Sequence, residues 1–165
     1  MNKNKVALVV GAGDAIGSAI VRKFAREGLI TVGVRRNGEK LKSVVDELTA
    51  EGHLAHGWSC DARSEDAIVD LFERIERELG ELDTVIFNVG ANVPMSVLDT
   101  SERKFRKIWE MACYGGFLTG REAARHMLPR ERGTILFTGA TFSWKGSAGF
   151  GAVVSGNDGL RAWTH

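Results

Sequence analysis

The stretch KVALVVGAGDAIG, Lys5 to Gly17, decides the fold because it joins a buried strand to a glycine turn. Val6 to Val10 is an unbroken apolar run, which is typical of a strand covered on both faces in a parallel sheet. Apolar residues recur at helical spacing from Ile16, so the glycines predict a tight turn into a helix. This arrangement directs free N–H groups of a helix start at the turn, where a pyrophosphate is a usual ligand.

The spacing of the turn leaves two interpretations open. It reads G-x-G-x-x-x-G, whereas the commonest dinucleotide fingerprint is G-x-G-x-x-G. A glycine turn after a strand is also common as a tight connection that binds no ligand. If the turn does bind a dinucleotide, its candidate residues are Gly11, Gly13, Asp14, Ala15, Ile16 and Gly17.

Length and composition indicate one ordinary globular domain. Of the 165 residues, 44% are hydrophobic and 26% are charged. The 22 Lys and Arg residues nearly balance the 21 Asp and Glu residues, so charge gives no argument for nucleic acid or an anionic membrane as partner. No apolar run is long enough to span a bilayer, and no signal-type segment is evident. We therefore expect a cytoplasmic protein.

The metal-ligating residue types are too scattered to predict a metal site. Cys60 and Cys113 lack C-x-x-C spacing, so they indicate neither a disulfide framework nor a zinc site. His53 and His56 are close in sequence, but no cysteine or carboxylate cluster accompanies them. We expect these histidines to lie at the surface.

Strands and helices alternate along the rest of the chain. Expected strands cover residues 6–10, 29–34, 54–60, 82–87 and 134–138, and expected helices begin near residues 16, 41, 64 and 100. The last of these helices runs to Met127, and residues 139–149 are expected to form a loop. This alternation with short connections predicts an α/β fold, a Rossmann-like doubly wound parallel sheet in the order 3-2-1-4-5 with helices on both faces.

Six stretches together resemble the short-chain dehydrogenase/reductase family, a group of NAD(P)-dependent oxidoreductases. They are VVGAGDAIG (9–17), TVGVRRNGEKL (31–41), CDA (60–62), FNVGAN (87–92), WEMACYGGF (109–117) and GTILFTGAT (133–141). The resemblance covers nearly the whole chain and implies a single NAD(P)-binding Rossmann domain over residues 1–165. The family's pattern continues with two further strands, so the resemblance also implies a chain truncated at its carboxyl end.

The glycine turn departs from the family's pattern at two positions. The family's T-G-x-x-x-G-x-G falls on Val10, Gly11, Ala15 and Gly17, so the threonine and the middle glycine are replaced. Alanine at position 15 keeps a small side chain, and Gly13 adds backbone freedom. We expect the phosphate-binding turn to survive in altered form.

Two further stretches match the family's cofactor-binding positions. Asp61, followed by Ala62, matches the family's aspartate beside the adenine, although by itself it is also an ordinary helix-entry residue. Asn88, Val89 and Gly90 stand where the family has the N-N-A-G motif beneath the cofactor's ribose. The resemblance therefore implies that these five residues contact the cofactor.

The end of the second expected strand favours NADP(H) over NAD(H). An acidic residue there would accept hydrogen bonds from the ribose 2'-hydroxyl, whereas a guanidinium pairs with a 2'-phosphate. Arg35 and Arg36 occupy this point, although two arginines after a strand are also common in a solvated turn. Asp14 argues the other way, because NADP-preferring members of the family often carry a basic residue just before the second glycine position.

The residues that perform the family's chemistry are replaced. The reaction needs a tyrosine, a lysine four residues later, a serine and usually an asparagine. The resemblance places Val153 at the tyrosine, Asn157 at the lysine, Ala140 at the serine and Ala112 at the asparagine. The single tyrosine, Tyr114, has no lysine at the required spacing. We therefore nominate no catalytic residue.

Three hypotheses about function follow. The first is an NADP(H)-binding domain, a pseudoenzyme of the family, that is impaired in hydride transfer. The second is an active NADP-dependent oxidoreductase of carbonyl or alcohol substrates that uses other residues or a partner chain. The third is a structural remnant or interaction protein without a ligand.

The long expected helix at 100–127 also predicts self-association. Phe105, Ile108 and Trp109 give it an apolar face that needs a partner, and the family builds its dimer interface from this helix and the next. We expect a homo-oligomer, which a monomer mass independent of concentration would rule out.

Overall fold

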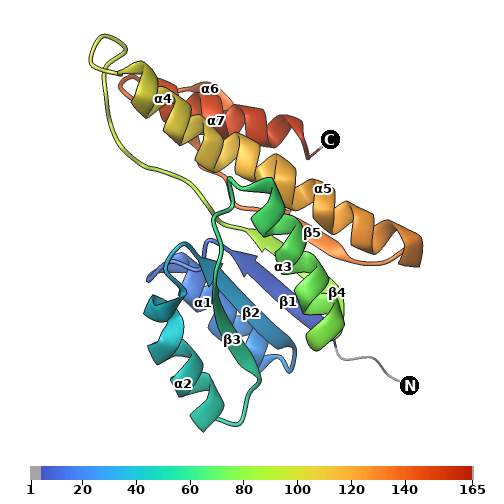
Figure 1. Ribbon diagram of the computed structural model, residues 1–165. Coiled ribbons are helices and arrows are strands. Elements are labelled where there is room, and N and C mark those ends of the chain that lie inside the picture. Colours follow the sequence, from blue (N-terminus) through green and yellow to red (C-terminus); the bar gives the residue numbers. More distant parts are fainter. Residues whose placement is uncertain (1–4, 165) are drawn as a thin grey trace.

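The computed structural model describes residues 5–164, apart from the side chains of residues 142 and 143. One parallel sheet has the strand order β3-β2-β1-β4-β5 (Figure 1), which confirms the prediction. The strands are β1 (Lys5–Val10), β2 (Ile30–Arg35), β3 (Ala55–Ser59), β4 (Glu81–Phe87) and β5 (Thr134–Phe137).

Helices cover both faces of this sheet. Helices α1 and α2 pack on one face, whereas α3, α5 and α7 contribute to the core on the other (Figure 1). The helical segments are α1 (Ile16–Arg26), η1 (Gly38–Leu41), α2 (Lys42–Ala50), α3 (Glu65–Glu78), α4 (Glu102–Trp109), η2 (Glu110–Tyr114), α5 (Gly115–Met127), η3 (Leu128–Arg130), α6 (Phe142–Lys145) and α7 (Gly151–Ala162).

The central strand β1 lies in the middle of two hydrophobic cores. Every residue from Val6 to Val10 is at most 1% exposed, as the unbroken apolar run predicted. Val6, Leu8 and Val10 face the core built with α3 and α5, whereas Val9 faces the core built with α1 and α2. Alternate side chains of a strand point to opposite faces, so a sheet covered on both sides buries them all.

The starts of the helices differ in a way that bears on ligand binding. Ser64, the expected N-cap of α3, accepts a hydrogen bond from the Ala67 N–H at 3.3 Å. At the start of α1, by contrast, Ala15 makes no side-chain capping hydrogen bond. The first N–H groups of α1 are therefore not capped by this side chain.

The long expected helix at 100–127 is interrupted. Helix α4 passes into a five-residue π-helical segment, η2, before α5 continues to Met127. A Cβ on Gly115 would lie 3.1 Å from the Ala62 carbonyl oxygen, and one on Gly116 would lie 2.2 Å from Leu160 Cδ1. The two glycines therefore allow close packing at the junction. This is expected, because glycine destabilises a helix and is tolerated where a neighbouring segment needs the space.

The expected loop at 139–149 contains one helical turn, α6, so that expectation was wrong in part. Residues 141–145 include neither glycine nor proline, and the Trp144 N–H donates to the Thr141 carbonyl at 3.2 Å. Gly146, with φ +63°, then ends the turn. Among residues 5–164, no helix combines the length and apolar character that crossing a membrane requires.

Candidate functional site

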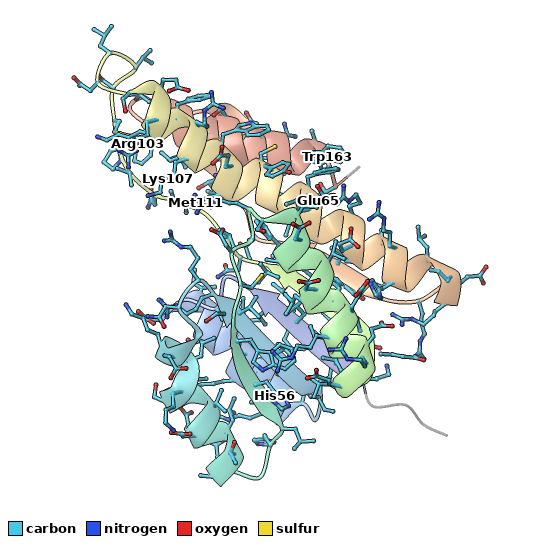
Figure 2. The ribbon with its side chains drawn as sticks, in the orientation of Figure 1. His56, Glu65, Arg103, Lys107, Met111 and Trp163 are labelled. Atoms are coloured by element: carbon cyan, nitrogen blue, oxygen red, sulfur yellow. The ribbon has the colours of Figure 1, made fainter. Side chains whose placement is uncertain are left out.

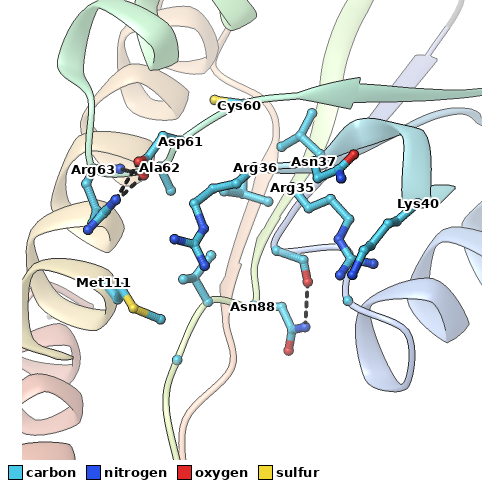
Figure 3. Close-up of a pocket in the computed structure, with 16 residues that line it drawn as sticks. Arg35, Arg36, Asn37, Lys40, Cys60, Asp61, Ala62, Arg63, Asn88 and Met111 are labelled. Carbon is cyan, nitrogen blue, oxygen red and sulfur yellow. Dashed lines mark hydrogen bonds and ion pairs between the residues drawn. The ribbon is translucent and has the colours of Figure 1, made fainter. Parts of the chain in front are cut away.

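A cavity of about 560 Å³ opens where β1, β2 and β4 end (Figure 3). Val10 of β1 is in register with Val34 of β2 and with Phe87 of β4, so the carboxyl ends of the three strands meet at one edge. The chain order reverses on the two sides of β1, and open α/β sheets bind ligands at such a point. The lining residues are Val10, Gly11, Gly13, Val34, Arg35, Arg36, Asn37, Lys40, Cys60, Asp61, Ala62, Arg63, Asn88, Val89, Gly90 and Met111.

Gly11 is required where the glycine turn leaves β1. Its φ of +92° is a conformation that side chains disfavour, and a Cβ would lie 2.4 Å from the Asn88 carbonyl oxygen. The N–H groups of Gly11 and Ala12 both donate to the Val34 carbonyl at 2.9 Å. These bonds hold the turn against the end of β2, and the close approach of Gly11 to Asn88 places it against the end of β4.

The remaining glycines of the turn have different environments. A Cβ on Gly17 would lie 2.4 Å from the Gly11 carbonyl oxygen, so this glycine lets α1 start directly over the turn. A Cβ on Gly13 would meet no atom within 4 Å, because Gly13 borders the cavity. Open space beside an uncapped helix start is an arrangement that suits a phosphate.

Asn88 connects the turn to the strand at the edge of the sheet. Its Nδ2 donates to the Gly11 carbonyl at 3.0 Å, and its Oδ1 accepts from the Thr138 hydroxyl at 3.0 Å. Its own N–H donates to the Val10 carbonyl at 2.7 Å. Asn88 therefore fixes the floor of the cavity through both its backbone and its side chain.

The charged residues that line the cavity are mostly cationic. Arg35, Arg36, Lys40 and Arg63 oppose a single lining carboxylate, Asp61. Figure 3 shows Arg36 extending into the cavity between Arg63 and Asn88. Such a lining favours a ligand with several negative charges.

Two carboxylates at the cavity are held by arginines. Arg63 donates to both carboxylate oxygens of Asp61, at 3.0 and 2.6 Å, and this hydrogen bonding lowers the pKa of Asp61 although burial opposes it. At the rim, Arg35 Nη1 donates to Asp14 Oδ1 at 2.5 Å. That hydrogen bond and the charge of Arg35 lower the pKa of Asp14, so both carboxyls are ionised at neutral pH.

Most of the residues nominated from the sequence come together at this cavity. The nominated residues that line it are Gly11, Gly13, Arg35, Arg36, Asp61, Ala62, Asn88, Val89 and Gly90. Asp14, Ala15, Ile16 and Gly17 lie beside it, in the turn and the first turn of α1, and Ile16 is 65% exposed.

Sequence reasoning missed several lining residues. Lys40 follows the two arginines within the quoted stretch TVGVRRNGEKL, so the same argument from charge would have found it. Met111 reaches the cavity from η2, and no local pattern in the sequence indicates that contact. Asn37, Cys60 and Arg63 were also missed.

The positions that match the family's catalytic residues are apolar or directed at the backbone. Val153 is 2% exposed and packs with Ile108 in a small hydrophobic cluster. Asn157 Nδ2 donates to the Val153 carbonyl at 2.9 Å within α7. Ala112, in η2, is 1% exposed. None of these side chains can donate or accept a proton in a reaction.

The Cys60 thiol lines the cavity, and Tyr114 lies at the end of η2. Burial raises the pKa of the Cys60 thiol to about 11, so it is a protonated, weak nucleophile at neutral pH. The Tyr114 ring lies against Phe117, with 6.3 Å between the ring centroids. No group of three or more metal-ligating side chains occurs within the described part of the chain.

Comparison with known proteins agrees with this architecture. The family model for short chain dehydrogenase matches residues 5–165. The chain is 32% identical over 138 residues to 2,3-dihydro-2,3-dihydroxybenzoate dehydrogenase from Bacillus subtilis. The aligned region covers 84% of this chain and 53% of that protein. It is 35% identical over 157 residues to versicolorin reductase from Emericella nidulans. That aligned region covers 94% of this chain and 58% of the relative.

A solved structure is also similar along the chain. The structure of a short-chain dehydrogenase from Rhodopseudomonas palustris superposes with a TM-score of 0.93 and 48% sequence identity, covering 96% of this chain and 74% of that one. The chain spans about half the length of the curated relatives that it matches. From the matched family model, the sheet order and the glycine turn at its switch point, we conclude that this chain belongs to the short-chain dehydrogenase/reductase family.

Proposed function

We propose that this domain binds NADP(H) in preference to NAD(H) and is impaired in the hydride transfer of its family. The observation that carries the proposal is the contrast between a cavity lined by four cationic side chains and catalytic positions without an ionisable group. As a binding module, the domain would sense the cofactor or pair with a related subunit. Membership of the family supports a nicotinamide dinucleotide as the ligand.

The preference for NADP(H) is supported by cations that form no ion pair with a carboxylate. Within residues 5–164, neither Arg36 nor Lys40 forms an ion pair, and both line the cavity beside the end of β2. A 2'-phosphate adds two negative charges where a 2'-hydroxyl has none, and guanidinium groups bind phosphate oxygens with strong, charge-assisted hydrogen bonds. Arg36 extends into the cavity and is the proposed principal contact (Figure 3).

The impairment is supported by what has replaced the proton-transfer groups. Valine and alanine carry no proton to exchange, and the Asn157 amide is uncharged and bonded to its own helix. A tyrosine's pKa is lowered by a nearby cation, and neither partner of such a pair stands at positions 153 and 157. The bound cofactor would supply a hydride, but the chain offers no proton donor at these positions.

The experiment that tests the binding is a titration of the folded chain with NADPH and with NADH, followed by cofactor fluorescence. We expect Arg36→Ala to raise the Kd for NADPH about tenfold and the Kd for NADH less than twofold, because one charge-assisted hydrogen bond to phosphate is lost. Arg77→Ala is the matched control, since Arg77 is an exposed arginine of α3 that pairs with Glu78. Equal Kd values for the two cofactors in the unchanged protein would contradict the preference.

A second candidate function is an active NADP-dependent oxidoreductase of carbonyl or alcohol substrates. The 48% identity to a protein named as a short-chain dehydrogenase favours it. NADPH oxidation that depends on an added carbonyl compound would establish this candidate and overturn the impairment. A folded chain that binds neither cofactor would overturn both candidates and leave a structural or interaction role.

Self-association and a cytoplasmic location remain part of the proposal. Phe105 and Trp109 of α4 are 44% and 38% exposed, which supports a partner on this helix.

The proposed cytoplasmic location is supported by the cysteines. Cys60 and Cys113 are both free thiols, which suits a reducing compartment.

A further inference from the structure

We propose that Asp14 competes with the cofactor's 2'-phosphate for Arg35 and so weakens the discrimination between NADP(H) and NAD(H). This inference rests on the proposed function and goes beyond it, because it assigns a specificity-determining role to a residue outside the cavity lining. Its basis is the position of one carboxylate at a rim that is otherwise cationic.

The two partners are presented from different elements. Arg35 is the last residue of β2 and its side chain is 20% exposed, so the strand and the cavity wall hold it in place. Asp14 directly follows Gly13 in the glycine turn, and its side chain is 80% exposed. The carboxylate therefore approaches a fixed guanidinium from the solvent side of the rim.

The contact is strong enough to compete and weak enough to be displaced. One bond of 2.5 Å joins Arg35 Nη1 to Asp14 Oδ1, whereas Arg63 holds Asp61 through both oxygens. An exposed pair held by a single bond contributes little free energy. A phosphate dianion can therefore take its place, but it must displace a like-charged group to do so.

The surrounding charges direct the effect to the 2'-phosphate. Lys40 also attracts Asp14 and lines the same cavity, so one carboxylate reduces the positive potential from two of the cavity's cations. Arg36 interacts with Asp61 only through charge and forms no ion pair within the described residues, so its guanidinium remains available to the ligand. The rim therefore favours the phosphorylated cofactor less than the number of its basic residues indicates.

The experiment compares the ratio of the Kd for NADH to the Kd for NADPH in five variants, which include Arg35→Ala alone and combined with Asp14→Asn. We expect Asp14→Asn to raise this ratio about three- to fivefold, the size of effect typical for an exposed ion pair. Asp14→Glu, which keeps the charge, should leave the ratio within about twofold of the unchanged protein. Asp46→Asn is the matched control, because it removes the same charge from an exposed pair with Lys42 on α2.

The double variant Asp14→Asn with Arg35→Ala decides whether Asp14 acts through Arg35. We expect the gain from Asp14→Asn to disappear in the Arg35→Ala background, because the two changes then act on one interaction. An unchanged ratio in Asp14→Asn, or the same gain without Arg35, would overturn the inference while leaving cofactor binding intact. A folded, unchanged protein that binds neither cofactor would overturn the proposed function and this inference together.

Discussion

Two regions of the fold differ in the kind of side chain that they contain. One is the edge of the sheet that faces the cavity, and the other is the helical layer of α4, η2 and α7. At the cavity, Asn88 and the arginines keep polar groups in defined hydrogen bonds. In the helical layer, Ala112 and Val153 fill space, and Gly156 allows close packing with Ala112. The first region presents charged and polar side chains to the cavity, whereas Ala112 and Val153 in the second contribute packing.

The difference shows which constraints the fold itself imposes. The helical layer needs apolar side chains of suitable volume, and valine or alanine satisfies that need without any catalytic group. In the glycine turn, no residue with a side chain can replace Gly11 or Gly17, because both lie against backbone atoms. The following substitutions test this contrast.

The largest effect is expected for Gly11→Ala. A methyl group 2.4 Å from the Asn88 carbonyl oxygen and a φ of +92° both oppose the substitution, so we expect a loss of about 3 kcal/mol in the free energy of unfolding. Chemical denaturation measures it.

Gly13→Ala is the matched change in the same turn. Nothing lies within 4 Å of its Cβ, so the free energy of unfolding should not fall. The Kd for NADPH should nevertheless rise about tenfold, because the methyl group occupies the proposed path of the phosphate. Equal destabilisation by both alanines would contradict the division between packing and binding glycines.

An intermediate effect is expected from replacing one asparagine in each region by alanine. Asn88→Ala removes two side-chain hydrogen bonds, one to the Gly11 carbonyl, which keeps the Gly13 N–H, and one from the Thr138 hydroxyl. We expect a loss of about 2 kcal/mol in the free energy of unfolding and weaker NADPH binding. Asn157→Ala removes only a bond within α7, and alanine's helix propensity offsets the loss to within about 0.5 kcal/mol. A larger effect at Asn157 would show that the helical layer keeps a polar function.

The smallest effect concerns pH. Because Arg63 lowers the pKa of Asp61, the pair stabilises the fold above the ordinary carboxyl pKa, and this contribution is lost as pH falls through the lowered value. We expect Arg63→Gln to cost about 0.5 kcal/mol at pH 7, allowing for solvent screening. The difference should shrink once the pH falls below the ordinary carboxyl pKa and vanish below the lowered pKa of Asp61. Asn157→Ala involves no titrating group, so its effect should not change with pH. Denaturation at several pH values separates the two.

The fold was predictable because its signals are local. The apolar run of β1, the helical spacing from Ile16 and the capping serine at position 64 each identify one element, and the short connections then fix the sheet order. The interruption at η2 was not predictable, because the spacing of apolar residues through η2 and the following Gly115 and Gly116 fits a continuous helix equally well. Close packing against Ala62 and Leu160 is a tertiary effect.

The position of several cavity residues was predictable from the sequence. Arg35 was predicted from its place at the end of β2, and Asp61 and Asn88 from the resemblance to the family; all three line the cavity. The pairing of Asp14 with Arg35 and the contact of Met111 depend on side-chain direction and on helix placement across the sheet, which spacing does not contain. The sequence suggested that Asp14 opposes the arginines, but not that it touches one.

The amide of Asn88 has a mechanical consequence. It bonds the Gly11 carbonyl on one side and the Thr138 hydroxyl on the other, so it works as a rigid brace between the first and the last strand of the chain. The brace thus connects the glycine turn to the end of β5, which leads on to Ala140. A ligand seated on the turn would therefore restrain the end of β5 as well as the end of β1.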